Sequence, residues 1–188
     1  MRTRPRQRGR GAGAGFSLIE VMVALAVVSI GLLGFSKAVL DAVVLSETNR
    51  ESGIARRAAK QVLSDIEATT FSEVFARYNA DASDDLASGD HLPGAFAVDG
   101  LQVADGDADG LAGEIVFPDD VAWDGSLHLR EDSVEASLGM PRDLNLDGVV
   151  DAEDHAGDYI VLPVLVRVAW RGPGGASKVE FRTVLIEP

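Results

Sequence analysis

One apolar run near the amino terminus limits what this chain can fold into. From Phe16 to Ser36 the run has 21 residues and one charged side chain, Glu20. A helix of this length, rising about 1.5 Å per residue, spans a bilayer core of roughly 30 Å. The run therefore predicts a membrane-spanning helix over residues 16–36. The presence of Glu20 in this run requires an explanation, because a carboxylate within a membrane is energetically costly.

Charge is distributed unevenly around this run. Five of the 17 basic residues are arginines within residues 1–15, so the rest of the chain carries 12 basic and 30 acidic side chains and a formal net charge of −18. The positive-inside rule predicts a cytoplasmic amino terminus and a body on the other side of the membrane. A body this acidic argues against a nucleic-acid partner, because phosphate binding needs clustered Lys and Arg.

Small residues precede the apolar run. A secretory signal has a shorter apolar core that is followed by a small-residue cleavage site. Here the sequence GAGAG occupies residues 11–15, before the run begins. We therefore expect cleavage on the cytoplasmic side, which leaves the apolar helix on the mature protein.

The basic leader (residues 1–15), Gly15, Phe16 and the following SLIEV resemble the class III signal of type IV prepilins and pseudopilins. The stretch GFSLIEVMVALAVVSIGLLG is most similar to the PilV and GspI branch of minor pilins. The resemblance implies that a prepilin peptidase cuts between Gly15 and Phe16 and methylates the new amino terminus. It also implies other pilins or pseudopilins as partners through the helix, an inner-membrane assembly platform, and a periplasmic head that later joins a pilus or pseudopilus.

Glu20 then has a physical role as an assembly residue. Cleavage creates a charged amine on Phe16, four residues before Glu20, and such residues share one helix face. When helices bundle in a fibre core, the amine of one subunit can meet the glutamate of another, and the pair is tolerable where neither charge is alone. The alternative is a plain single-span anchor with an interfacial glutamate.

Periodicity predicts one long helix over residues 16–69, followed by a connector over 70–95 and a β-rich head over 96–188. Apolar residues recur at steps of three and four along residues 54–66, which is typical of an amphipathic helix. DYIVLPVLVRVAW and SKVEFRTVLIE flank RGPGGA and predict a β-hairpin. We expect an α+β, pilin-like fold, with a small antiparallel sheet packed on the second half of the helix.

The sequence DLNLDGVVDAED, residues 143–154, matches the twelve-residue spacing of an EF-hand calcium loop, with aspartate in place of the last glutamate. We expect a structural Ca²⁺ here and Val150 pointing inward as the loop's anchor. A solvated acidic loop is the alternative, and we expect His155, just after the loop, to be solvated. The predicted ligands are Asp143, Asn145, Asp147, the carbonyl of Val149, Asp151 and Asp154.

A second acidic stretch, DGDADG at residues 105–110, repeats only the first half of this spacing. Asp105, Asp107 and Asp109 therefore form a weaker candidate for calcium, and a turn rich in Asp and Gly is the alternative.

No catalytic motif emerges from the three histidines or from the glycine-containing stretches, so we expect no enzyme. We expect Trp123 and Trp170 to serve core or subunit packing. The sequence favours a minor pilin or pilin-like subunit that is assembled into, or primes, a type IV pilus. The alternatives are a type II secretion pseudopilin and a membrane-tethered calcium-dependent binding module.

Overall fold

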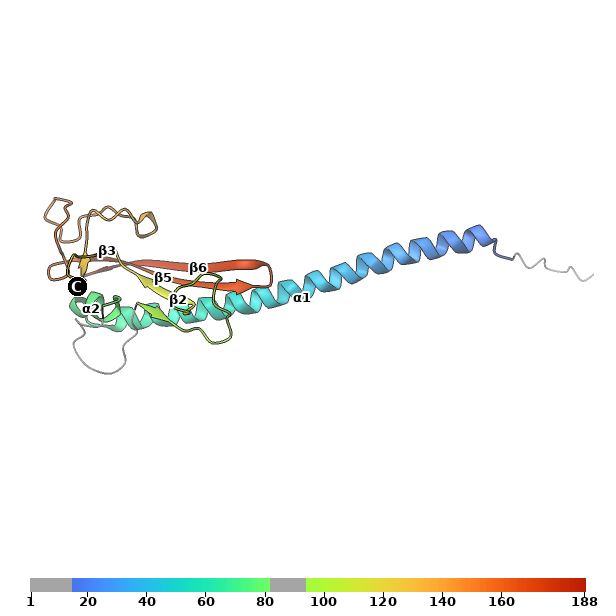
Figure 1. The fold of residues 1–188 in the computed structure, drawn as a ribbon, viewed down its shortest axis with the longest axis horizontal. Helices are drawn as coiled ribbons and strands as arrows, with labels where there is room; N and C mark the ends of the chain where they lie inside the picture. Colours follow the sequence, from blue (N-terminus) through green and yellow to red (C-terminus); the bar gives the residue numbers. More distant parts are fainter. Residues whose placement is uncertain (1–14, 82–93) are drawn as a thin grey trace, which may run out of the picture. The chain divides into compact units, whose positions relative to one another are not determined.

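The computed structural model describes residues 15–81 and 94–188 (Figure 1). Most of the predicted leader (1–14), the middle of the predicted connector (82–93) and His91 lie outside the described residues. The chain has two structural units, which divide within helix α1 (Leu18–Ala68), between Val43 and Val44.

The first unit contains the start of α1. Ser17 precedes the helix, and its Oγ accepts a hydrogen bond from the Glu20 amide at 3.2 Å. This serine cap supplies a partner for a free amide of the first turn. It places the first helical residue at Leu18 and not at Phe16. The large apolar side chains of this unit, from Phe16 to Val43, are exposed, and by length and composition α1 is the one described helix able to cross a membrane.

The second unit begins with the amphipathic half of α1. Ala55, Ala59, Val62 and Ile66 are buried. Steps of three and four place these small and branched side chains on a single face of the helix. After α1, a short 3₁₀ segment η1 (Phe71–Glu73) leads into helix α2 (Val74–Tyr78). These buried positions form the helical side of the head's core.

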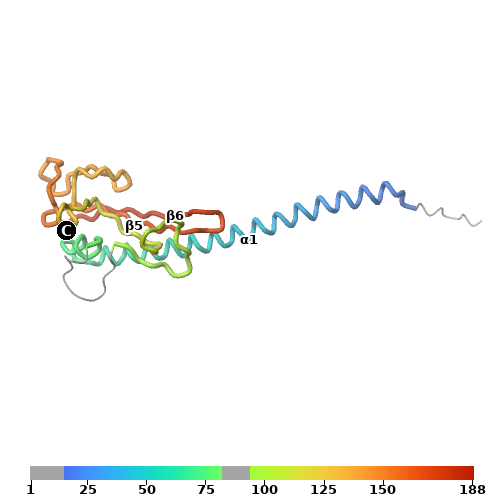
Figure 2. Tube along the Cα trace, in the orientation of Figure 1, coloured from blue at the N-terminus to red at the C-terminus, as the bar shows by residue number. Residues whose placement is uncertain are grey.

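A four-stranded antiparallel sheet, in the order β1-β2-β5-β6, packs on this helical face. Its strands are β1 (Ala95–Phe96), β2 (Gly113–Val116), β5 (Val161–Gly172) and β6 (Gly175–Ile186). The hairpin β5–β6 pairs every residue of the two strands, with Val161 opposite Ile186 and Gly172 opposite Gly175 (Figure 2).

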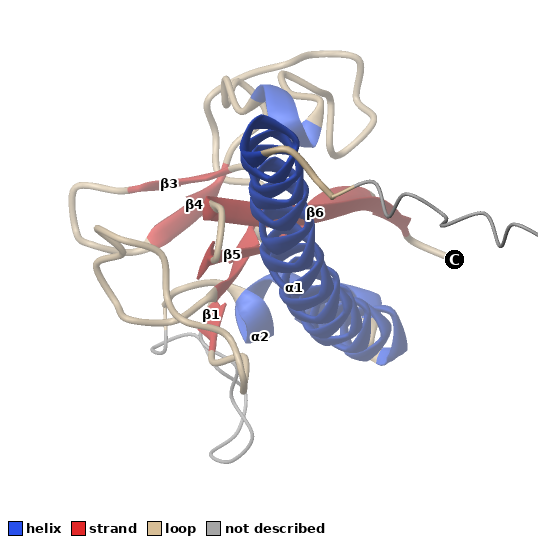
Figure 3. Cartoon of the chain, turned by 90° about the vertical axis from the view of Figure 1, so that its right-hand side faces the viewer, coloured by secondary structure: helices blue, strands red, loops and turns tan. Residues whose placement is uncertain are grey.

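Specific contacts join the sheet to α1. Trp170 of β5 is buried, and its Nε1 donates to Glu51 of α1 at 3.0 Å. The Lys60 ammonium of α1 lies 5.9 Å from the centre of the Phe181 ring of β6. The sheet therefore lies alongside the second half of the helix, as Figures 1 and 3 show, and the predicted α+β fold is confirmed.

A loop-rich segment covers the other side of the sheet near the start of β5 (Figure 1). It contains a two-stranded sheet of β3 (Asp119–Val121) and β4 (Leu127–Leu129), and the 3₁₀ turn η2 (Ala136–Leu138). The segment contributes buried side chains to the core, among them Leu129, Leu138, Met140, Leu144 and Tyr159. The first part of β5 is consequently buried on both faces, and the long acidic loop is attached to this core.

Candidate functional site

The predicted processing junction lies at the exposed end of the first unit. Gly15 has open space around it, since a Cβ built there would meet nothing within 4 Å. Phe16 is exposed and precedes the first helical residue. The Glu20 carboxylate forms no ion pair within residues 15–81 and 94–188. The junction residues and the predicted assembly residue are therefore all accessible to a partner.

The acidic loop, residues 143–154, is held from outside by Glu131. This glutamate is fully buried, and its carboxylate accepts hydrogen bonds from the backbone amides of Leu144, Asn145 and Asp151. A buried charge needs such compensation, and three amide donors supply it. Sequence reasoning missed Glu131, because it lies outside the twelve-residue spacing and no local pattern links it to the loop.

Asp143 opens the loop with its two carboxylate oxygens in different surroundings. Its Oδ2 accepts a hydrogen bond from the Gly148 amide at 2.8 Å, across the turn that the loop makes. Its Oδ1 is buried and has no hydrogen-bond partner among the described residues. Such an atom is unusual, because buried polar groups nearly always find a partner.

The other predicted ligands shape the backbone of the loop. The Asn145 Oδ1 accepts from the Asp147 amide at 3.1 Å, and the Asp147 Oδ1 accepts from the Val149 amide at 2.8 Å. The Asp154 Oδ1 accepts from the Leu129 amide of β4 at 3.0 Å and so ties the end of the loop to the small sheet. Gly148 has a φ of 89°, the left-handed conformation that suits the sharp turn expected at position six.

His155 is buried, at 4 % exposure, so the expectation that it is solvated is wrong. Its Nε2 lies 3.2 Å from Asp151 and 3.8 Å from Glu131, and its Nδ1 lies 3.1 Å from Asp158. Burial acts to lower the pKa of the imidazole, but the two aspartate hydrogen bonds and the Glu131 charge raise the pKa above its ordinary value. Three carboxylates therefore surround this buried histidine.

Asp151 belongs to the same cluster. Hydrogen bonds from the Glu153 amide and the His155 imidazole lower the pKa of its carboxyl group. The ligand atoms of Glu131, Asp151 and His155 lie within 4.8 Å of one another, which is close enough to hold a metal ion. The structure therefore adds two buried residues, Glu131 and His155, to the acidic site that the sequence indicates.

The prediction that Val150 points inward and anchors the loop is also wrong, because this side chain is 47 % exposed. Leu144, at position two of the loop, is completely buried and anchors the loop instead. Its carbonyl accepts hydrogen bonds from the amides of Ile160 and Val161, each at 2.8 Å, at the start of β5. The loop is held at its first residues by Glu131 and the start of β5, and near its end by Glu131 and β4. Residues 146–150, between these two attachments, are exposed.

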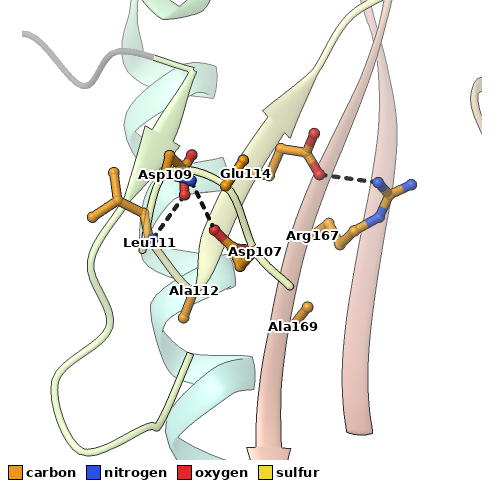
Figure 4. Close-up of a pocket in the computed structure, with 8 residues that line it drawn as sticks. Asp107, Asp109, Leu111, Ala112, Glu114, Arg167 and Ala169 are labelled. Carbon is orange, nitrogen blue, oxygen red and sulfur yellow. Dashed lines mark hydrogen bonds and ion pairs between the residues drawn. The ribbon is translucent and has the colours of Figure 1, made fainter. Parts of the chain in front are cut away.

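The second acidic stretch has a different structure (Figure 4). The Asp105 carboxylate forms an ion pair with Arg171 at 2.9 Å. The Asp107 Oδ1 accepts from the amides of Asp109 and Gly110, which is typical of a capped turn. The stretch borders a cavity of about 240 Å³ beside Glu114 and Arg167. Its carboxylates are occupied by an arginine and by backbone amides, and calcium there stays a prediction.

The two tryptophans differ. Trp170 lies in the core of the head, as expected, whereas Trp123, in the turn between β3 and β4, is 97 % exposed and does not pack in the described core. Subunit packing by Trp123 stays a prediction.

A family model for the prokaryotic N-terminal methylation motif matches residues 12–36 of this chain. The matched segment contains Gly15, Phe16, Glu20 and the exposed apolar residues of α1 up to Phe35. Searches of curated proteins and of solved structures returned no match. The chain carries a prepilin-type methylation motif, which supports a type IV pilin-like or pseudopilin protein.

Proposed function

We propose that this chain is a minor pilin or pilin-like structural subunit that is matured by a prepilin peptidase and assembled into, or primes, a type IV pilus. The methylation motif over residues 12–36 carries this proposal. The fold supports it, because an exposed apolar helical segment belongs to the same chain as a compact α+β head. A helix that is apolar all round needs lipid or other helices to bury it.

Maturation would begin at the Gly15–Phe16 peptide bond. Both residues precede the helix, so the backbone there is not locked in helical hydrogen bonds. Hydrolysis of this bond would free the Phe16 amine, which the peptidase would then methylate. The leader with its arginines would stay behind on the cytoplasmic side.

Assembly would use the charge that cleavage creates. The Phe16 amine of an incoming subunit and the Glu20 carboxylate of a neighbour would pair within a bundle of apolar helices. Each charge alone would be strongly disfavoured there. Glu20 is suited to this role because only its backbone amide is used locally, in a hydrogen bond to the Ser17 hydroxyl. Its carboxylate is exposed and forms no ion pair in the described part of the chain.

Localisation follows from the same features. The precursor would be a single-pass inner-membrane protein with a cytoplasmic amino terminus and a periplasmic head, and it would later move into the fibre. The methylation motif is shared by type IV pilins and pseudopilins, so the second candidate is a pseudopilin of a type II secretion system. The two differ in where the mature subunit accumulates: in surface fibres or in the cell envelope.

The experiment replaces Gly15 by valine in the native bacterium and follows the precursor and mature forms by immunoblot. Val at this position should block cleavage, so the chain should keep its 15-residue leader. Gly13→Val is the matched control, because it makes the same change two residues earlier and should leave maturation intact. Normal maturation of the Gly15→Val chain would overturn the proposal.

Glu20→Gln separates maturation from assembly. The amide keeps the size and hydrogen-bonding shape of the side chain but cannot neutralise the Phe16 amine. We expect normal cleavage with the mature protein retained in the membrane and lost from the fibre fraction. Wild-type amounts in the fibre would exclude Glu20 as the assembly residue.

A further inference from the structure

We propose that the acidic loop, residues 143–154, is a calcium site that braces the head. The carboxylates of Asp143, Asp147, Asp151 and Asp154, the amide oxygen of Asn145 and the carbonyl of Val149 would supply its ligands. Ca²⁺ takes six to eight oxygen ligands, and this set offers that number without a sulfur or nitrogen atom. The inference is independent of the methylation motif.

The buried Oδ1 of Asp143 is the observation that points to a ligand. This carboxylate oxygen is shielded from water and has no hydrogen-bond donor among the described residues. Burying an acceptor without a partner is unfavourable, and more so when it carries charge. A cation bound in the loop would supply the missing partner at the position where the spacing places the first ligand.

The charges around the loop give the second, independent argument. Some other acidic side chains of the head pair with arginines: Asp105 with Arg171, Asp132 with Arg130, and both Glu114 and Glu180 with Arg167. In the described ranges, no Lys or Arg forms an ion pair with the four loop aspartates, and the one basic side chain that contacts them is the His155 ring next to Asp151. The loop therefore concentrates negative charge that a divalent cation would balance.

The surroundings leave these ligands available. Glu131, which is not a loop residue, fixes the backbone at Leu144, Asn145 and Asp151, so the loop is shaped before any ion binds. Bound calcium would add a link between the loop and β4 through Asp154, whose Oδ1 already holds the Leu129 amide. The head has no disulfide, because the chain has no cysteine, and a metal can provide an equivalent brace.

The test is calorimetric titration of the full-length chain in detergent micelles with CaCl₂, after removal of metals. We expect one saturable site with a Kd below roughly 1 mM, the weak limit of extracellular calcium modules. Asp143→Ala should weaken binding at least about 10-fold, the smallest loss usual even for an outer-shell partner of a metal. MgCl₂ should bind more weakly, because Mg²⁺ demands a smaller, octahedral site.

Glu153→Ala is the matched control. It removes one negative charge from the same exposed loop at position eleven, which is not a ligand position, and its affinity should stay within about twofold of wild type. Asp147→Ala is the second ligand variant, for use if Asp143→Ala loses its circular-dichroism signature. The proposal is overturned if the wild type shows no saturable heat up to 10-fold above that limit, if Glu153→Ala weakens binding as much as the ligand variants, or if Mg²⁺ binds equally well.

Discussion

Both halves of helix α1 carry apolar side chains, but these side chains have opposite surroundings in the two halves. In the first half Ile30 is 71 % exposed, whereas in the second half Ile66 is completely buried. The sequence explains the difference, because apolar residues surround the first half on all sides and form one stripe on the second. The second half buries its stripe against its own sheet, and the first half must be buried by something outside the described chain. One continuous helix thus packs into the head at one end and exposes apolar side chains at the other.

The largest expected effect comes from shortening the same side chain in each half. Ile66→Ala should lower the free energy of unfolding of the head by about 2–5 kcal/mol, because it leaves a cavity in the core. Ile30→Ala should change it by less than about 0.5 kcal/mol, as exposed substitutions usually do. Denaturation of the full chain in detergent, followed through the fluorescence of buried Trp170, measures both. Equal losses would break the comparison.

A smaller effect follows from adding a methyl group to a glycine. A Cβ at Gly113 of β2 would overlap the Phe96 ring, whereas a Cβ at Gly34 of α1 would meet nothing within 4 Å. Gly113→Ala should therefore destabilise the head by about 1–3 kcal/mol through overpacking. Gly34→Ala should leave head unfolding unchanged in the same assay. If Gly113→Ala unfolds at the wild-type denaturant concentration, the close packing of β1 on β2 is wrong.

The smallest expected effect is electrostatic and depends on pH. Hydrogen bonds from Lys178 and Arg167 lower the pKa of Glu180 below its ordinary value of 4.5. Its charge therefore stabilises the folded head above pH 4.5, and this contribution is lost as the pH falls through the lowered pKa. Glu180→Gln should lower the free energy of unfolding of the head by about 0.2–1 kcal/mol at pH 7, which is the usual contribution of a partly exposed ion pair. It should have no effect at a pH where the wild-type carboxyl group is protonated.

The control for this prediction is Asp41→Asn, which breaks the exposed Lys37–Asp41 pair of the first unit and should not affect the head at either pH. A cost of Glu180→Gln that is the same at pH 7 and at acid pH would show that packing, and not charge, accounts for the effect.

Local patterns were sufficient to predict most of the fold. The 3.6-residue stripe ending at Ile66 and the alternation within the β5–β6 hairpin each follow from a short stretch of sequence. Pro163 is a more subtle case, because it lies in interior strand β5. The pairing of β5 with β2 ends at Leu165, so Pro163 lies beyond the part of β5 that pairs with β2. The missing N–H of the proline therefore costs no hydrogen bond to β2.

The acidic site could be predicted only in part. Spacing identifies the loop from Asp143 to Asp154, because its ligand pattern is local. Glu131 contacts Asp151 across 20 residues, and no periodicity connects the two. The burial of His155 depends on the same long-range contact. The two acidic stretches also show why half a motif is weak evidence for calcium. Asp105 is paired with an arginine, whereas Asp143 has a buried oxygen with no hydrogen-bond partner in the described part of the chain.

The most direct test of the central claim is mass spectrometry of the amino-terminal peptide, in sheared surface fibres and in membranes separately. The account predicts a chain that begins at a methylated Phe16, and its presence in the sheared fraction would identify a pilus subunit. The same terminus confined to membranes would favour the pseudopilin assignment. An intact leader in both fractions would contradict maturation at Gly15–Phe16 and with it the pilin-like function.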